Sequence, residues 1–339
     1  MKPEDFSSLP RRDFLKGLSF AAAGLAVPQL LSAAETAPAP AVSLGAVPRR
    51  QLGRTKEMVS VIGVGGSSFA QAASEEESIR IVQEAVDAGI NFMDNAWHYH
   101  DGRSEILMGK ALKGRRDKAF LMTKDCTHGK GKDVAMAHLE DSLKRLQTDH
   151  LDLWMIHELS SMAEVEAAFA PGGAIEALDE ARKQGKVRYV GFTGHTSAEI
   201  HMAMLKHNYP FDAVLLPVNA FEQHREAFRT QVLPHLVKQE MGILGIKSMG
   251  GGRGRVVSDG KITAKKAITF ALSHPITVQI VGMRSVQNLR DDLEIVRNFT
   301  PMTPSEMKEL TVQMAAVNLN LRYTGYRQPG YRDGLGLVS

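Results

Sequence analysis

The chain has 339 residues, of which 43% are hydrophobic and 23% are charged. This is an ordinary globular composition with enough apolar material for a buried core, which excludes a mainly disordered chain. The formal net charge is only +3, and no Lys/Arg stripe interleaved with aromatic residues occurs, so we expect no nucleic-acid partner. The predicted partner is a small molecule, and the length admits a single α/β barrel domain.

The first 34 residues have the pattern of an export signal. Arg11 and Arg12 precede a Phe-Leu-Lys segment at residues 14–16, and an apolar run covers residues 18–31. That run is too short to span a bilayer, and small residues follow it up to Ala34. The segment resembles a twin-arginine signal, which implies export by the twin-arginine machinery to the periplasm, cleavage near Ala34 and no stable membrane anchor afterwards. The alternative is an incidental arginine pair before an amphipathic or anchor helix.

The rest of the chain divides into a tether, a barrel and a tail. Residues 35–48 are rich in Pro and Ala and predict an extended tether, residues 49–320 the barrel, and residues 321–339 a tail whose role the sequence does not indicate. Cys126 is the single cysteine, so no intrachain disulfide can form. Because the twin-arginine route carries folded proteins, often with a cofactor inside, the signal also points weakly to a bound cofactor.

From residue 59 onward, short apolar runs alternate with segments of helical period, which indicates parallel strands joined by helices. Eight such units predict an α/β fold, a single-domain parallel (β/α)₈ TIM barrel. A doubly wound open sheet is the alternative, but residues 61–68 lack the Gly-x-Gly-x-x-Gly turn that it favours. The predicted strands are Val59–Val64, Ile90–Met93, Ala119–Met122, Leu151–Ile156, Val187–Phe192, Ala213–Leu216, Gly242–Ile246 and Thr277–Val281.

Four polar residues follow the second, third and fourth predicted strands, whose carboxyl ends converge on one rim of a barrel: Asp94, Tyr99, Lys124 and His157. This set suits carbonyl reduction, in which a phenol donates a proton to the carbonyl oxygen as hydride reaches the carbon. A free phenol is a weak acid with a pKa of about 10. A nearby ammonium lowers that pKa, a carboxylate holds the ammonium, and an imidazole orients the carbonyl. Each residue alone also has a structural explanation, such as a cap or a solvated charge.

Segments 91–99, 122–124 and 142–157 resemble the three signatures of the aldo/keto reductases. The resemblance continues through residues 185–191 and 281–285, and so covers about residues 49–300. It implies that Tyr99 is the general acid of a tetrad with Asp94, Lys124 and His157. It further implies reduction of a small aldehyde or ketone with NADP(H), NADP being preferred over NAD.

The resemblance also assigns a dinucleotide site across the barrel mouth. Loops of small residues after the seventh and eighth strands would let backbone amides approach a pyrophosphate, and Arg284 would contact the adenosine 2′-phosphate. Arg284 could instead be only a surface charge, and the glycine-rich segment 248–252 could be only a flexible loop. The assigned positions are Gly66, Thr193, Gly194, Lys247, Ser248, Met249, Gly250, Gly282, Arg284, Asn288 and Asp292.

Four positions of this site depart from the usual family pattern. Gly194 replaces an asparagine, Leu215 a glutamine, Lys247 an aromatic residue and Asp292 an asparagine. These departures concern how the nicotinamide and adenine ends are held, and they leave the tetrad intact.

Two other functions remain open. A metal-dependent barrel hydrolase would use histidines that follow successive strands, although the His-x-His pair that such enzymes favour after the first strand is missing. The reductase interpretation assigns no metal. A non-catalytic exported barrel that binds a dinucleotide or small ligand is suggested by Gly194 and Leu215. The histidines in question are His98, His100, His128, His157, His195 and His224.

Overall fold

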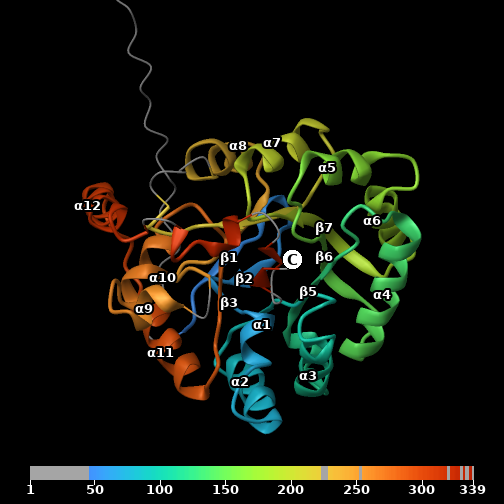
Figure 1. The fold of residues 1–339 in the computed structure, drawn as a ribbon. Helices are drawn as coiled ribbons and strands as arrows, with labels where there is room; N and C mark the ends of the chain where they lie inside the picture. The colour runs from blue at the N-terminus through green and yellow to red at the C-terminus, as the bar shows by residue number, and fades with distance from the viewer. Residues whose placement is uncertain are drawn as a thin grey trace, which may run out of the picture. The chain divides into compact units, whose positions relative to one another are not determined.

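The computed structural model describes residues 46–222, 228–251, 254–318, 321–328, 331–332 and 336–337. Its centre is a closed barrel of eight parallel strands in the order β10-β3-β4-β5-β6-β7-β8-β9 (Figure 1). This confirms the predicted parallel (β/α)₈ barrel. The barrel strands are β3 (Ile62–Val64), β4 (Phe92–Met93), β5 (Phe120–Asp125), β6 (Leu151–Ile156), β7 (Val187–Thr193), β8 (Ala213–Pro217), β9 (Gly242–Ile246) and β10 (Val278–Val281).

Helices surround the barrel on its outer side (Figure 1). Several begin where a side chain can accept the first amides: Ser74 accepts from the Glu77 amide, and Thr303 with Glu306 forms a capping box. The α-helices are α1 (Gly66–Phe69), α2 (Glu75–Asp87), α3 (Arg103–Leu112), α4 (Lys132–Leu146), α5 (Met162–Phe169), α6 (Ala174–Lys183), α7 (Ala198–Lys206), α8 (Leu233–Lys238), α9 (Arg255–Ser258), α10 (Ala264–Leu272), α11 (Val286–Arg297) and α12 (Pro304–Ala315). Shorter turns are η1 (Gly53–Thr55), η2 (Arg116–Lys118), η4 (Phe228–Val232) and η6 (Gly325–Arg327).

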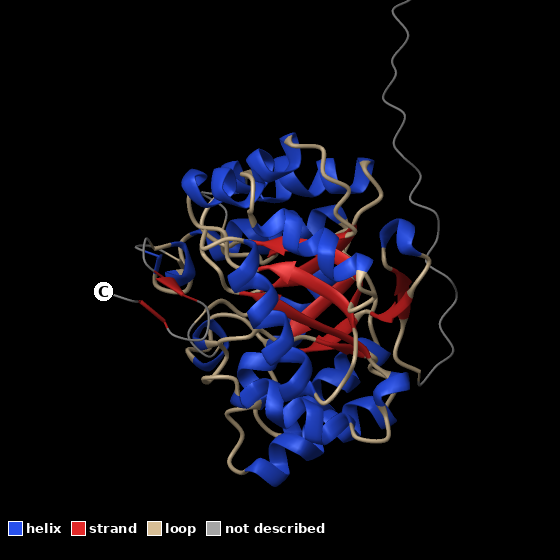
Figure 2. Cartoon of the chain, turned by 90° about the vertical axis from the view of Figure 1, so that its right-hand side faces the viewer, coloured by secondary structure: helices blue, strands red, loops and turns tan. Residues whose placement is uncertain are grey.

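The predicted first strand is two strands in the structure. Residues Met58–Ser60 form β2, which pairs antiparallel with β1 (Arg49–Gln51), and the chain then turns into β3 of the barrel. The side chain of Ser60 secures the turn, because its hydroxyl donates to the Ile62 carbonyl at 2.7 Å and accepts from the Asn91 amide at 3.1 Å. Figure 2 shows this hairpin at the end of the barrel opposite to the C-terminal segment. Its residue Val59 packs into the apolar interior of the barrel.

The inward-facing row of each strand determines where the polar residues lie. Side chains alternate between the two faces of a strand, and Phe92, Met122 and Met155 belong to the apolar interior cluster. Hydrogen bonds from the Asp94 amide to Val64 and from the His157 amide to Asp125 carry the ladder past the strand ends. A polar layer therefore closes the interior at the carboxyl ends: Asp94 after Phe92, Lys124 after Met122, His157 after Met155 and Thr193 after Gly191.

The C-terminal segment packs on the same end of the barrel. Arg327 donates to both carboxylate oxygens of Glu222 at 2.9 and 2.7 Å, and both side chains are buried. The Tyr326 hydroxyl accepts from the Asn219 side chain at 3.0 Å and donates to Glu222. Beyond η6, strands β11 (Tyr331–Arg332) and β12 (Gly336–Leu337) form a two-stranded sheet. The tail is thus tied to the loop that follows β8.

The predicted export signal, residues 1–34, lies outside the described residues, as does the tether up to residue 45. Val47, two residues beyond this segment, is already buried in the core. Within the described part of the chain, no helix is both long enough and apolar enough to cross a membrane.

Candidate active site

A buried ion pair lies at the centre of the polar layer. Lys124 Nζ is 2.5 Å from Asp94 Oδ1 and donates to the Asn95 carbonyl at 2.7 Å, with 1% and 3% of the lysine and aspartate side chains exposed. The second carboxylate oxygen accepts from the Gly66 amide at 3.2 Å. A Cβ at Gly66 would lie 2.6 Å from the Asp94 carbonyl oxygen. Gly66 therefore serves the site by letting the two backbones approach.

Tyr99 is brought to this pair by the turn after β4. Its hydroxyl is 3.4 Å from Lys124 Nζ, and its ring lies edge-on to the ring of His157 with the centroids 5.8 Å apart. Only 1% of Tyr99 is exposed, yet it lines the large cleft described below. The structure thus brings together the four residues of the predicted tetrad. An ammonium beside the hydroxyl stabilises the anion that remains when a phenol gives up its proton.

A cleft of about 620 Å³ runs from Asp94 and Tyr99 across the loops after β9 and β10. This volume is in the range of sites for cofactors and other small molecules. Most predicted cofactor residues line it: Lys247, Ser248, Met249, Gly250, Gly282, Arg284, Asn288 and Asp292. The sequence analysis missed further lining residues, among them Gly65, Ser67, Ser68 and Gln71 after β3 and Tyr331 of the tail.

The donors along the cleft suit a phosphorylated ligand. Ser285 caps α11 by accepting from the Asn288 amide at 3.1 Å, so the amino end of this helix opens beside Arg284. The Arg284 guanidinium is held by Gln71 Oε1 at 3.0 Å. At the other end, the Lys247 ammonium is 5.5 Å from the ring centroids of both Tyr326 and Tyr331. Two cations and a helix terminus can therefore receive an extended anion.

Three predicted cofactor residues do not line the cleft: Gly66, Thr193 and Gly194. Packing explains Gly194, because a Cβ there would lie 2.7 Å from the Leu159 carbonyl oxygen. Thr193 is fully buried on the inward row, and its hydroxyl has no hydrogen-bond partner among the described residues. Leu215, its register partner on β8, belongs to the apolar interior and offers no polar group.

The predicted ring of histidines does not converge on one point within the described residues. His100 contacts the Ser67 carbonyl at 2.7 Å, and His128 is 3.6 Å from a carboxylate oxygen of Glu164. His195 Nδ1 lies 4.0 Å from Glu158, and His224 is outside the described residues.

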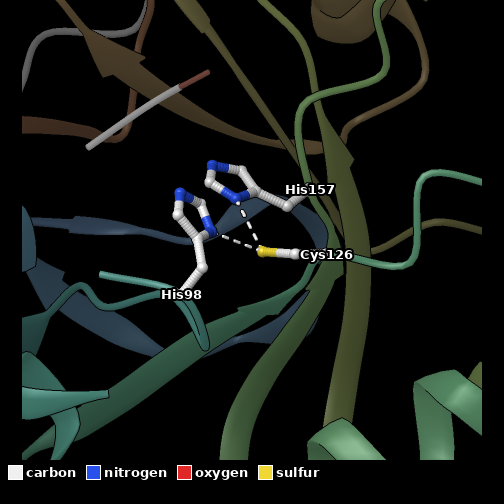
Figure 3. A group of neighbouring side chains, drawn as sticks. All are labelled: His98, Cys126 and His157. Carbon is white, nitrogen blue, oxygen red and sulfur yellow. Dashed lines mark hydrogen bonds between the residues drawn. The ribbon is translucent and has the colours of Figure 1, made fainter. Parts of the chain in front are cut away.

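His98 and His157 instead flank Cys126, which the sequence analysis considered only for disulfides (Figure 3). A signal for this position was available. Cys126 continues the inward row of Met122 and Lys124 with a period of two.

A family model described as the aldo/keto reductase family matches residues 61–259, more than half of the chain. The chain belongs to this family. An uncharacterized oxidoreductase of Bacillus subtilis, YrpG, is 27% identical over 298 residues, which cover 72% of this chain and 90% of the relative. The L-galactose dehydrogenase of Arabidopsis thaliana is 26% identical over 285 residues, which cover 73% and 87%.

Solved aldo/keto reductases share the fold. The holo form of the aldo-keto reductase AKR11C1 from Bacillus halodurans superposes with a TM-score of 0.64 at 23% identity, covering 83% of this chain and 99% of that structure. An aldo-keto reductase from Klebsiella pneumoniae in complex with NADPH gives a TM-score of 0.65 at 19% identity, covering 81% and 98%. Membership of the family makes the chain an oxidoreductase of this fold.

In this reductase, the Asp292 carboxyl group lines the cleft with only 5% of the residue exposed. Burial raises its pKa to about 8, and the neighbouring Asp291 adds to the rise. Between about pH 4 and pH 8, the folded state thus holds one proton more than the unfolded state. The free energy of unfolding should fall by about 1.4 kcal/mol per pH unit in this window and level off above it.

We predict that Asp292→Asn removes this fall in the free energy of unfolding with rising pH, because an amide does not ionise. The variant should gain in Tm relative to the parent between about pH 5 and pH 8, as measured by thermal unfolding followed by circular dichroism. The exposed Asp291→Asn serves as control and should retain a downward slope. If Tm changed with pH in the same way in the parent and in Asp292→Asn, the raised pKa would not belong to Asp292.

Proposed function

We propose that this aldo/keto reductase reduces the carbonyl group of a small aldehyde or ketone with NADPH, and that Tyr99 is the general acid. The observation that carries the proposal is the continuous set of contacts from Asp94 through Lys124 to the Tyr99 hydroxyl, at 2.5 and 3.4 Å, at one end of the cleft. When bound, the dinucleotide supplies the hydride. The protein's own residues supply the proton and hold the reacting groups.

The proton moves from the Tyr99 hydroxyl to the carbonyl oxygen of the substrate. The phenolate left behind is stabilised by the Lys124 ammonium, and Asp94 keeps that ammonium in place. The ring of His157 packs edge-on against Tyr99 and belongs to the same polar layer. From this position it can orient the carbonyl oxygen of the substrate. Near-complete burial excludes bulk water, which would otherwise weaken these interactions.

The cofactor assignment rests on the cleft and on relatives. Arg284 at the amino end of α11 offers a guanidinium fork for the 2′-phosphate that distinguishes NADPH from NADH. Solved aldo-keto reductases from Klebsiella pneumoniae contain NADP with acetate in one case and NADPH in another.

The tetrad distinguishes this proposal from a purely binding barrel. Burying a lysine and an aspartate costs several kcal/mol per ion before their attraction offsets it. A carrier for a dinucleotide gains nothing from placing that pair beside a phenol, whereas proton transfer requires it.

We also propose that residues 1–34 direct export of the folded enzyme to the periplasm through the twin-arginine machinery. The Arg11-Arg12 pair, the short apolar run and the small residues before position 35 support this.

We expect Tyr99→Phe to lower kcat for carbonyl reduction by about 100-fold or more, since the variant keeps the ring but loses the transferable proton. NADPH binding, followed by fluorescence titration, should stay within about 2-fold of the parent because the ring still fills its place. Tyr209→Phe is the matched control: its hydroxyl contacts Asp179 on the outer surface. Reduction by Tyr99→Phe at the parent rate would refute the acid assignment.

Arg284→Ala should weaken NADPH binding by roughly 10- to 100-fold, the value of one charge-assisted contact, and leave NADH binding nearly unchanged. Arg290→Ala on the same helix is the control, because that side chain is exposed and pairs with Glu84. Equal losses for both cofactors would show that Arg284 does not recognise the 2′-phosphate.

Replacing both Arg11 and Arg12 by Lys should abolish accumulation of mature protein in the periplasm, because the twin-arginine receptor reads the pair itself. Fractionation with N-terminal sequencing of the exported form measures both the route and the cleavage site. Unchanged export of the double variant would contradict the proposed route.

A further inference from the structure

Three potential metal ligands meet beside the tetrad, and each comes from a different element. His98 lies in the turn after β4, Cys126 directly after β5 and His157 directly after β6. Their ligand atoms all lie within 4.8 Å of one another. Figure 3 shows the sulfur beside both imidazole rings and linked to one nitrogen of each, with His98 Nδ1 at 2.7 Å and His157 Nδ1 at 3.3 Å from Sγ.

Simple hydrogen bonding gives a weak account of this arrangement. Nitrogen–oxygen hydrogen bonds measure about 2.7–3.2 Å, and sulfur is a larger and poorer partner than oxygen. Cys126 Sγ nevertheless faces two ring nitrogens at once, His98 Nδ1 and His157 Nδ1. A thiol is both a weak donor and a weak acceptor, so it binds the two nitrogens only weakly, whereas a cation can accept electron pairs from all three atoms at once.

One of the two nitrogen–sulfur distances is close to that of a tetrahedral zinc site, and the other is shorter. Bonds of about 2.3 Å to sulfur and about 2.0–2.1 Å to nitrogen place the two kinds of ligand roughly 3.5 Å apart. The His157 nitrogen is already close to that separation at 3.3 Å. His98 is only partly buried and lies in a turn, so its ring can move outward to make room for an ion.

We propose that His98, Cys126 and His157 form a zinc-binding site at the barrel mouth, through the two Nδ1 atoms and Sγ. A His₂Cys set leaves the fourth tetrahedral position open to water or a ligand, as in catalytic rather than structural zinc sites. This is a second binding property of the chain, beyond its proposed reductase activity.

The electrostatic surroundings favour a cation at this point. Asp125 and Glu158 adjoin two of the ligands in the chain and are themselves buried, with 1% and 2% of their surfaces exposed. Zinc displaces the thiol proton and offsets the negative charge around it.

The site is compatible with a reductase role for His157. An ion on Nδ1 leaves the proton of a neutral imidazole on Nε2, which fixes the tautomer of the ring. The metal site nevertheless stands on its own contacts, because neither His98 nor Cys126 belongs to the tetrad. Metal binding can therefore be measured without NADPH or a carbonyl substrate, and its outcome does not depend on whether the protein reduces carbonyls.

The test uses the full chain, purified without a polyhistidine tag, stripped with a chelator and kept reduced under anaerobic conditions. Titration with Co²⁺ should give one equivalent of bound metal with thiolate-to-cobalt charge-transfer absorption, and Zn²⁺ should displace it. Cys126→Ser should abolish the charge-transfer band and weaken Zn²⁺ binding by about 100-fold, and His98→Asn should weaken it by about 10-fold or more.

His100→Asn is the matched control, since His100 lies in the same turn but contacts Ser67 and Gln71. This variant should bind Zn²⁺ like the parent. Thermal unfolding by circular dichroism checks that each variant is folded, and the partly exposed His98 keeps the test valid if Cys126→Ser proves unstable. Cobalt binding without the charge-transfer band, or equal zinc affinity in the parent and His98→Asn, would overturn the proposal.

Discussion

The active end of this barrel depends on the buried ion pair between Lys124 and Asp94. Removing two opposite charges from water costs several kcal/mol per ion, and the pair persists only where other contacts satisfy the remaining lone pairs and protons. Here the Asn95 carbonyl accepts from the ammonium and the Gly66 amide donates to the carboxylate. These partners come from the ends of three consecutive strands, so the pair depends on β3, β4 and β5 lying side by side in the closed barrel.

The same closure decides which end of the barrel carries chemistry. Below the polar layer, the inward rows of the strands are apolar and form one packed cluster, which the hairpin residues Leu52 and Val59 complete at the far end. Above it, the ladder hydrogen bonds continue for a residue or two, while the side chains become charged or polar. Tyr99 lies in a turn and not on a strand. Lys124 contacts it in two ways, through its hydroxyl and as a cation 4.9 Å from its ring centroid.

The sequence suffices to predict the features that follow from periodicity. Alternation of apolar runs with helical segments predicts the eight strands, and the strand ends predict that Asp94, Lys124 and His157 share a rim. Period two also places Cys126 on the inward row, which the sequence analysis overlooked. The β1–β2 hairpin escaped prediction because Ser60 turns the chain through contacts with Asn91, a residue 31 positions away. The glycine at position 194 resembles a ligand position, but the approach of the Leu159 carbonyl explains it.

The packing of the tail against the cleft could not be predicted from the sequence, and the reason is physical. Arg327 and Glu222 are 105 positions apart, and neither residue type predicts burial. Their pairing holds η6 against the loop after β8. Tyr331, a few residues further on, lines the cleft, and its hydroxyl is 3.5 Å from Lys247 Nζ. The Lys247 ammonium therefore lies against two tyrosines of the tail, 5.5 Å from the ring centroids of both Tyr326 and Tyr331. The wall of the cleft beside Lys247 is consequently shared between the barrel and the tail, which the Arg327–Glu222 pair holds together.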